Sequence, residues 1–159
     1  MNTLNIPHTH INDLSLGNKN HKSVALFDFD GTITSKDTFL EFIKYYKGIS
    51  SFLLGILLLS PVLILFKLKL IQNWKAKEIV LSYFFKGENA EIFKKRCDNY
   101  AILRIPKVTK VKALRYIELH KKYNHDIFVV SASAEVWLSK WCEKMDLKLI
   151  STKLEIQNG

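Results

Sequence analysis

The chain has 159 residues and a formal net charge of +9, from 24 Lys and Arg against 15 Asp and Glu. A hydrophobic fraction of 48% with only 6 Gly and 3 Pro fits one globular domain and excludes collagen, a low-complexity chain and a disulfide scaffold. The charge is concentrated in residues 67–122, which carry 15 basic and 5 acidic residues. Such a segment is suited to contact an anionic membrane, a phosphorylated substrate or nucleic acid. The alternative is that its charges simply form the solvated faces of helices. Because no repeat of aromatic and basic residues accompanies the charge, we do not expect a nucleic-acid partner.

The N-terminal 22 residues have neither the basic nor the apolar region of a signal peptide. They are rich in Asn and His, and we expect residues 1–22 to be a disordered tail. Cys97 and Cys142 lie far apart without a metal-ligand spacing, which favours a reducing compartment. We therefore expect a cytoplasmic protein, with membrane association as an alternative that the apolar run described below raises.

Short apolar runs predict buried strands, and longer amphipathic segments between them predict helices. The expected strands are residues 23–29, 127–130, 147–151 and 153–157. The expected helices are residues 38–46, 74–85, 90–102, 108–123, with Pro106 suited to a first turn at the start of the last of these, and 136–145. This order predicts an α/β core with helices inserted after the first strand.

Residues 48–66, GISSFLLGILLLSPVLILF, contain no charge, and as one helix they would reach about 28 Å, close to the thickness of a hydrocarbon core. Ser60 is a good N-cap and Pro61 a good first helical residue, which would divide the run into two short helices. Three structures stay open: a buried helix pair, an interfacial or re-entrant hairpin, and a tilted transmembrane helix. The flanking lysines Lys44, Lys47, Lys67, Lys69 and Lys75 suit anionic lipid headgroups in the second.

The sequence Asp28-Phe29-Asp30-Gly31-Thr32 ends the first strand. Alternation sends Asp28 and Asp30 to the same side, where two carboxylates repel each other unless a divalent cation such as Mg²⁺ neutralises them. One carboxylate can then act as a nucleophile while the other transfers protons. Gly31 lets the backbone approach an anion, and Thr32 offers a hydroxyl and an N–H group. The alternative is an ordinary strand end with an Asp-Gly turn.

The second strand ends in VVSAS, which places Ser131 at the end of the strand and at the start of a helix. A hydroxyl and helix N-terminal amides would then face the same edge of the sheet as Asp28 and predict a phosphate pocket. Ser131 is alternatively an ordinary helix N-cap.

The segments VALFDFDGTITSKDTF and IFVVSASAEVWLSKW resemble the first and second motifs of the haloacid dehalogenase (HAD) superfamily. With helices inserted directly after the first motif, the chain is similar to subfamily IB, which includes phosphoserine phosphatase. The resemblance runs from residue 23 to the end of the chain. It implies a three-layer Rossmann-like core with a parallel sheet, formed by residues 23–36 and 104–159, and a helical cap formed by residues 37–103.

The resemblance further implies an Mg²⁺-dependent phosphomonoester hydrolase that works through an aspartyl-phosphate. Asp28 would be the nucleophile and Asp30 the general acid and base, with Mg²⁺ bound by Asp28 and the Asp30 backbone carbonyl. Ser131 and the Ala132 amide would hold the phosphoryl oxygens together with the Gly31-Thr32 turn. Asp37 falls where phosphoserine phosphatases contact the substrate amine, although it is equally suited to cap the next helix.

A second resemblance concerns the substrate. DTFLEFIKYY, followed by the apolar stretch and a basic helix, resembles the membrane-associated phosphatidylglycerophosphate phosphatases of the same superfamily. The expected partner is therefore a small phosphorylated metabolite or a phospholipid phosphate, with a membrane surface contacted through residues 48–66 as one alternative.

After Ser131 the sequence contains neither the third-motif lysine nor the acidic pair of the fourth motif, and it ends on Asn158-Gly159, a hairpin-turn signal without a returning strand. We therefore expect the core to be incomplete at the C-terminus. The alternative to a phosphatase is a truncated, catalytically impaired module that binds phosphate or a membrane.

Overall fold

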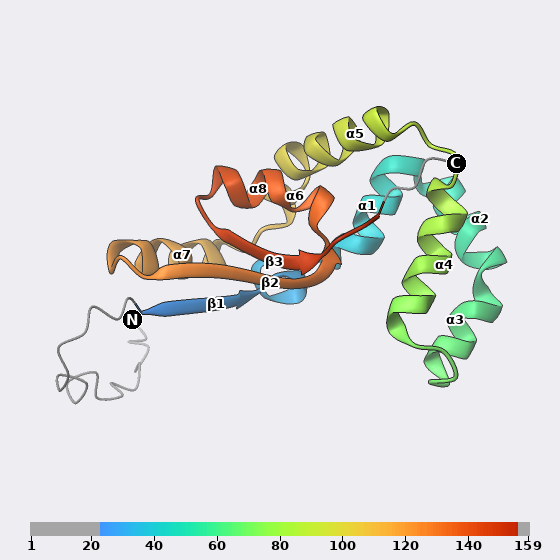
Figure 1. Ribbon diagram of the computed structural model, residues 1–159, viewed down its shortest axis with the longest axis horizontal. Coiled ribbons are helices and arrows are strands. Elements are labelled where there is room, and N and C mark those ends of the chain that lie inside the picture. The colour runs from blue at the N-terminus through green and yellow to red at the C-terminus, as the bar shows by residue number, and fades with distance from the viewer. Residues whose placement is uncertain (1–22, 156–159) are drawn as a thin grey trace, which may run out of the picture.

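The computed structural model describes residues 23–155 (Figure 1). Three parallel strands form the sheet in the order β1-β2-β3: β1 (Val24–Asp28), β2 (Asp126–Ala134) and β3 (Lys148–Thr152). The register pairs Asp28 of β1 with Val130 of β2 and Val130 with Ile150 of β3. The three predicted strands are therefore confirmed, but residues 153–155 form no fourth strand. The rest of that expected strand and the tail predicted at residues 1–22 lie outside the described residues.

Most helices lie between β1 and β2, as the periodicity predicted. They are α1 (Thr38–Lys47), α2 (Ile49–Leu58), α3 (Ser60–Lys67), α4 (Asn73–Phe85), α5 (Ala90–Leu103), α6 (Ile105–Val108) and α7 (Val111–Lys122), and a turn of π-helix, η1 (Phe29–Ile33), precedes them. The 3₁₀ turn η2 (Glu135–Trp137) and α8 (Ser139–Lys144) follow β2. Two predicted helices are thus divided, since Pro106 lies in the separate helix α6 and the helix expected at residues 136–145 is broken after Trp137.

The two faces of the sheet are covered differently. Ala25, Ile127 and Val129 are buried on one face, and α7 places the ring of His120 edge-on against Phe27 there. On the opposite face Leu26, Val130 and Ile150 are 68%, 40% and 52% exposed. The three-layer arrangement would need helices on this second face, and residues 23–155 place none over these side chains.

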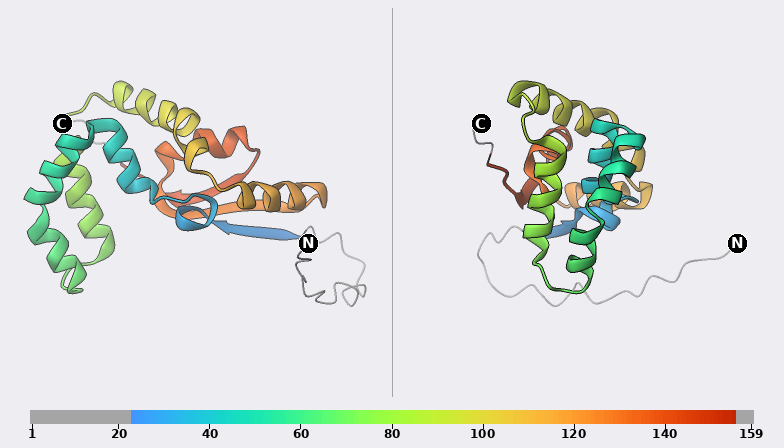
Figure 2. Two further views of the ribbon diagram at one scale, coloured as in Figure 1. Left: turned by 180° about the vertical axis from the view of Figure 1, so that it is seen from behind. Right: turned by 90° about the vertical axis from the view of Figure 1, so that its right-hand side faces the viewer.

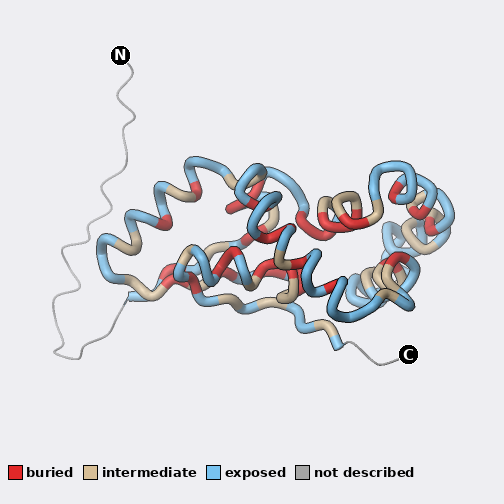
Figure 3. Tube along the Cα trace, turned by 90° about the horizontal axis from the view of Figure 1, so that it is seen from above, coloured by how far each residue is buried: buried red, intermediate tan, exposed pale blue. Residues whose placement is uncertain are grey.

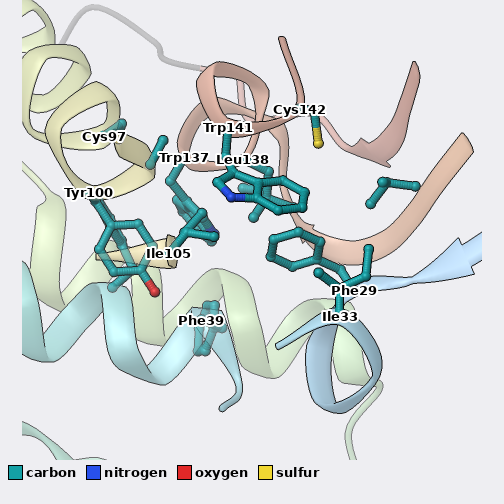
Figure 4. Close-up of a cluster of buried hydrophobic side chains, with 14 of the residues drawn as sticks. Phe29, Ile33, Phe39, Cys97, Tyr100, Ile105, Trp137, Leu138, Trp141 and Cys142 are labelled. Carbon is teal, nitrogen blue, oxygen red and sulfur yellow. The ribbon is translucent and has the colours of Figure 1, made fainter. Parts of the chain in front are cut away.

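The main core lies where the inserted helices meet the sheet (Figure 4). We call the buried side chains around Trp137 the junction cluster; it contains Phe29, Ile33, Phe39, Phe42, Tyr100, Ile105, Trp137, Leu138 and Trp141. Phe42 of α1 stacks on Trp137 of η2, with 4.6 Å between ring centroids. Burial of each such side chain contributes about 1.5–3 kcal/mol, so this cluster fixes α1 and α5 against the end of the sheet.

The bent helix pair α2–α3 (Ile49–Lys67) projects from the end of the molecule opposite α7, and α4 runs back beside it on the side nearer the sheet (Figures 1 and 2). We call residues 49–67 the α2–α3 hairpin because this pair is the outer arm of a hairpin whose returning arm is α4. No single helix among the described residues is long and apolar enough to cross a membrane; α2 and α3 satisfy that test only as a pair, and they are bent by 63°. The continuous transmembrane helix is therefore not formed. The buried pair is not formed either, because α3 buries no residue and α2 buries only Phe52 and Gly55 (Figure 3).

The break in the hairpin falls where Pro61 predicted it, but Ser60 is not the cap. Leu59 is the N-cap residue, Ser60 is the first residue of α3, and no side chain caps this helix. Pro61 lies in the first turn of α3, where its missing N–H group has no helical partner to lose.

Candidate active site

The loop after β1 presents its polar groups at the carboxyl end of the strand. Gly31 has φ +81°, a left-handed conformation that favours glycine, and it turns the chain back within η1. The Thr32 hydroxyl donates to Asp28 Oδ2 at 2.8 Å, and the Asp28 side chain is exposed. This bond fixes one oxygen of Asp28, while Oδ1 accepts no hydrogen bond from residues 23–155.

Asp30 has the most hydrogen-bond partners in the loop. Its Oδ1 accepts from the backbone N–H of Thr38 at 2.7 Å and from the Thr38 hydroxyl at 2.6 Å. Its Oδ2 accepts from the hydroxyls of Ser131 at 3.1 Å and Ser133 at 2.8 Å. The carboxylate thus joins three elements, η1, the start of α1 and β2, and its four donors hold it in one orientation.

Ser131 lies inside β2 and does not begin a helix, which corrects the prediction. The strand continues to Ala134, and the 3₁₀ turn η2 follows it. The next α-helix, α8, begins only at Ser139. The pairing of β2 with β3 is irregular between Ser131 and Ala134, and this bulge re-aims the side chains at the strand end. Ser131 Oγ accepts from the N–H of Ser133 at 3.0 Å, so a local turn of the strand takes the place of the expected helix terminus.

Two lysines from elsewhere in the chain reach this region. Lys110 Nζ donates to the carbonyl of Gly31, and its own N–H donates to the Ile33 carbonyl at 2.8 Å. Lys77 of α4 donates through Nζ to the carbonyl of Ala132 at 2.9 Å. The strand-end loop therefore has an ammonium group on the core side and another on the side of the inserted helices.

Tyr100 of α5 is hydrogen-bonded to the backbone of Thr38, at the start of α1. It is 1% exposed, and its hydroxyl donates to the Thr38 carbonyl at 3.4 Å. Burial raises the pKa of Tyr100 well above its usual range, with smaller contributions from Glu41 and Asp30. The hydroxyl therefore stays protonated and remains a donor, which helps to hold the first turn of α1 against Asp30.

Of the predicted site residues, the structure joins Asp30 to Ser131 and Asp28 to Thr32 by hydrogen bonds, and Gly31 supplies the turn between them. Ala132 is exposed at the bulge. Asp37 does not join this group among the described contacts: its Oδ1 accepts from Leu40 N–H at 3.1 Å and caps α1, the second of its two predicted roles.

The sequence interpretation missed Thr38, Ser133, Lys77 and Lys110. A signal for Ser133 was present, because Ser131 and Ser133 are two residues apart in an extended segment and so share a face. No local pattern marks Thr38 or the two lysines, since each reaches the loop from another element.

The donor set can be compared with the needs of Mg²⁺. Within residues 23–155 no group of three or more His, Cys, Asp and Glu side chains could hold a metal ion. Mg²⁺, however, is usually bound by one or two carboxylates and keeps several waters. The exposed Asp28 carboxylate and the backbone carbonyl of Asp30 are oxygen donors of this kind on one turn, so the residues fit a partly hydrated Mg²⁺.

A parallel α/β sheet with an acidic loop at the carboxyl end of its first strand, bonded to a serine of the neighbouring strand, defines the class of this protein as a Rossmann-like α/β protein with a strand-end polar site. The family model for haloacid dehalogenase-like hydrolases matches residues 25–159, and the chain belongs to this family. A search of curated proteins found no match.

Solved structures with the same fold include a protein of unknown function from Bordetella pertussis Tohama I, with a TM-score of 0.71 at 15% identity over 87% of this chain and 63% of that one. A structure described as a phospho-aspartyl intermediate analogue of phosphoserine phosphatase gives 0.56 at 18% identity over 87% and 59%. A HAD family hydrolase from Salmonella enterica serovar Typhi gives 0.62 at 14% identity over 86% and 42%. The chain thus spans less than two thirds of the length of each of these proteins.

Proposed function

We propose that the chain carries the active site of an Mg²⁺-dependent phosphomonoester hydrolase that acts through an aspartyl-phosphate on Asp28. The observation that carries this proposal is the hydrogen bond between Asp30 in the loop after β1 and Ser131 in β2, which joins the two predicted motifs at one edge of the sheet. Membership of the haloacid dehalogenase-like hydrolase family and the fold shared with a phosphoserine phosphatase support the same reaction class.

In the first step an oxygen of Asp28 attacks phosphorus and the bond from phosphorus to the alcohol oxygen breaks. The proton that the leaving alcohol needs comes from Asp30. In the second step water attacks the phosphorus of the aspartyl-phosphate, gives its proton to Asp30, and the bond to Asp28 breaks to release inorganic phosphate. The two steps use both carboxylates of the motif, and they balance in protons over one cycle.

The neighbouring groups position these carboxylates. Thr32 holds Asp28 Oδ2 and leaves Oδ1 free to attack. Thr38, Ser131 and Ser133 orient Asp30, which exchanges one of these bonds for the leaving oxygen. We assign the phosphoryl oxygens to the amides of the Gly31-Thr32 turn, the Ala132 amide and the Ser131 hydroxyl, whose single proton leaves Asp30 for the phosphate when the substrate binds. Mg²⁺ bound by Asp28 and the Asp30 carbonyl would neutralise the charge that the carboxylates and the phosphate bring together.

Asp28→Asn tests this function directly. We expect the wild-type chain to release phosphate from small monoesters with Mg²⁺ and to lose that activity with excess chelator, and we expect the variant to lose about a thousandfold or more. Asp98→Asn, an isosteric change on α5 away from the loop, is the matched control. Equal phosphate release from wild type and Asp28→Asn would exclude Asp28 as the nucleophile. Phosphate binding without release would instead identify a binding module.

A lipid phosphate is the second candidate substrate, because the α2–α3 hairpin exposes large apolar side chains. Leu54, Leu57 and Ile64 are 57%, 68% and 57% exposed. Trp74, 63% exposed, and the basic residues Lys67 and Lys69 follow at the end of the hairpin. Apolar side chains beside lysines and a tryptophan suit the headgroup region of an anionic bilayer. We propose that this hairpin contacts such a surface without spanning it.

Vesicle sedimentation tests the membrane contact. We expect binding to vesicles that contain phosphatidylglycerol, weaker binding to pure phosphatidylcholine, and further weakening as salt rises to about 0.5 M. The triple variant Leu54→Gln, Leu57→Gln, Ile64→Gln should bind at least about tenfold more weakly. The double variant Ile92→Gln, Leu119→Gln changes exposed apolar residues elsewhere and is the control. Unchanged binding of the triple variant, or self-association in place of vesicle binding, would contradict the proposal.

A further inference from the structure

Lys77 links the inserted helices to the strand-end loop. It lies in α4, and its Nζ donates to the carbonyl of Ala132 at 2.9 Å, across 55 positions in the chain. The same ammonium group lies 5.5 Å from the centroid of the Phe39 ring in α1. The side chain is half-buried and lies between α1, α4 and the end of β2.

The charge of Lys77 is not compensated within the described part of the chain. Its helix neighbour Lys75 pairs with Glu78 at 2.8 Å, and Lys47 pairs with Glu88, but no carboxylate of residues 23–155 lies within ion-pair distance of Lys77. An ammonium group has three donors, and Ala132 accepts from one of them. A partly buried cation with unused donors is stabilised by an anion that comes from elsewhere.

The position of this cation relative to the loop indicates which anion it would bind. Ala132 lies between Ser131 and Ser133, and both of these donate to Asp30. A phosphoryl group held by the loop of Asp28 and by Ser131 belongs to the β1 and β2 side of the site. Lys77 reaches the end of β2 from α4, one of the inserted helices (Figure 1). We expect a substrate that extends from the loop toward these helices to pass its ammonium group.

We infer that Lys77 is a specificity-determining residue that binds an anionic oxygen group on the alcohol portion of the phosphate monoester. This inference rests on the proposed function. A carboxylate on a small metabolite and a phosphodiester in a phospholipid headgroup both supply this chemistry. Lys77 thereby selects monoesters whose alcohol carries a negative charge over neutral or cationic ones.

Two pairs of monoesters test the inference and distinguish the two sources. O-phosphoserine and O-phosphoethanolamine differ by a carboxylate, and phosphatidylglycerophosphate and phosphatidic acid in mixed micelles differ by a phosphodiester. We expect wild type to prefer the first member of one of these pairs. The pair that shows a preference tells whether Lys77 binds a metabolite carboxylate or a headgroup phosphodiester. Lys77→Met should lower kcat/KM for the preferred ester by about 10- to 100-fold, mainly through KM, and change the other member by less than about twofold.

Lys77→Arg should retain the preference, because it keeps a cation at this position. Lys86→Met, an exposed lysine at the end of α4, should leave both esters unchanged. An equal loss on both members of the pair, an unchanged preference in Lys77→Met, or a wild-type chain without any preference would overturn the inference.

Binding measurements separate this result from a failure of the proposed function. In the Asp28→Asn background, which removes the nucleophile, calorimetric titration with the same two pairs needs no turnover. If the wild-type chain releases no phosphate but binding still shows a Lys77-dependent preference, the proposed reaction fails and the role of Lys77 stands. If phosphate is released and Lys77→Met binds both members as wild type does, the reaction stands and the role of Lys77 fails.

Discussion

The junction cluster and the α2–α3 hairpin are both rich in large apolar side chains, but they use them in opposite ways. Phe42 and Trp137 in the junction are at most 1% exposed and stack on each other, whereas Leu57 and Leu58 in the hairpin are 68% and 58% exposed. In α1 the apolar residues recur on one side of the helix and meet η2 and α5, while in α2 and α3 they surround the helices. The apolar content of a helix therefore did not decide how much of it is buried. α2 and α3 have apolar residues on all sides, and the neighbouring elements cover only part of that surface.

Truncation in the junction gives the largest expected effect. Phe42→Ala removes a ring that contacts Tyr46, Phe85, Phe93, Tyr100 and Trp137 and that is fully buried. We expect the free energy of unfolding to fall by about 3–5 kcal/mol, measured by urea denaturation. Leu57→Ala in the hairpin is the comparison variant, and it should change the free energy by less than about 0.5 kcal/mol. Similar losses in the two variants would mean that the hairpin is covered in solution.

Gly55 tests the packing of α2 against α4. A Cβ atom at this position would lie 2.2 Å from Cζ of Phe84 on α4. Helix propensity alone would make Gly55→Ala stabilising by about 1 kcal/mol, but the clash reverses the sign, and we expect a net loss of about 1–3 kcal/mol in thermal or urea unfolding. Ser51→Ala, on the exposed side of α2, is the control and should be neutral or slightly stabilising. Stabilisation by Gly55→Ala would show that α2 does not pack on α4.

Glu88 connects the end of α1 to the segment before α5 and gives a smaller effect. Hydrogen bonds from Lys47 and then from Tyr46 lower the pKa of Glu88 below its ordinary value of 4.5. Because the folded-state pKa is the lower one, this contribution is present above about pH 4.5 and is lost as pH falls through the folded-state value. Glu88→Gln should cost about 0.5–1 kcal/mol at pH 7 and flatten the loss of stability between pH 5 and pH 3, followed by urea unfolding. An unchanged acid profile would contradict this assignment.

Cys97 and Cys142 lie in the same buried core as the junction cluster, so their reactivity tests without any mutation whether that core stays closed. Burial raises the pKa of Cys97 and of Cys142 to about 12, and both are at most 1% exposed. At pH 8 they are therefore protonated and inaccessible, and we expect no measurable alkylation by iodoacetamide in the native chain but full alkylation in urea. Rapid native reaction would show that the junction opens and would weaken its contrast with the hairpin.

The local sequence determined much of this protein. Apolar runs predicted three strands, helical periodicity predicted α1, α4 and α5 closely, and Pro61 marked the break between α2 and α3. The DFDGT segment predicted a turn after the first strand, and Gly31 forms this turn in a left-handed conformation, because turn chemistry acts over a few residues. The resemblance of the DFDGT and VVSAS segments to two known motifs also indicated the haloacid dehalogenase family, to which the chain belongs.

Only the tertiary structure decided the surroundings of that loop. Ser131 stayed in the strand because β3 and a bulge continue the pairing beyond it, so the expected helix terminus did not form. Asp30 received Thr38 and Ser133 as donors, and Lys77 and Lys110 reached the loop, through contacts that join residues 8 to 103 positions apart. Such contacts depend on how the helices pack on the sheet, and packing sums many weak interactions that no local pattern records. The sequence therefore predicted the strand and turn that carry the two carboxylates, and the tertiary structure decided their hydrogen-bond partners.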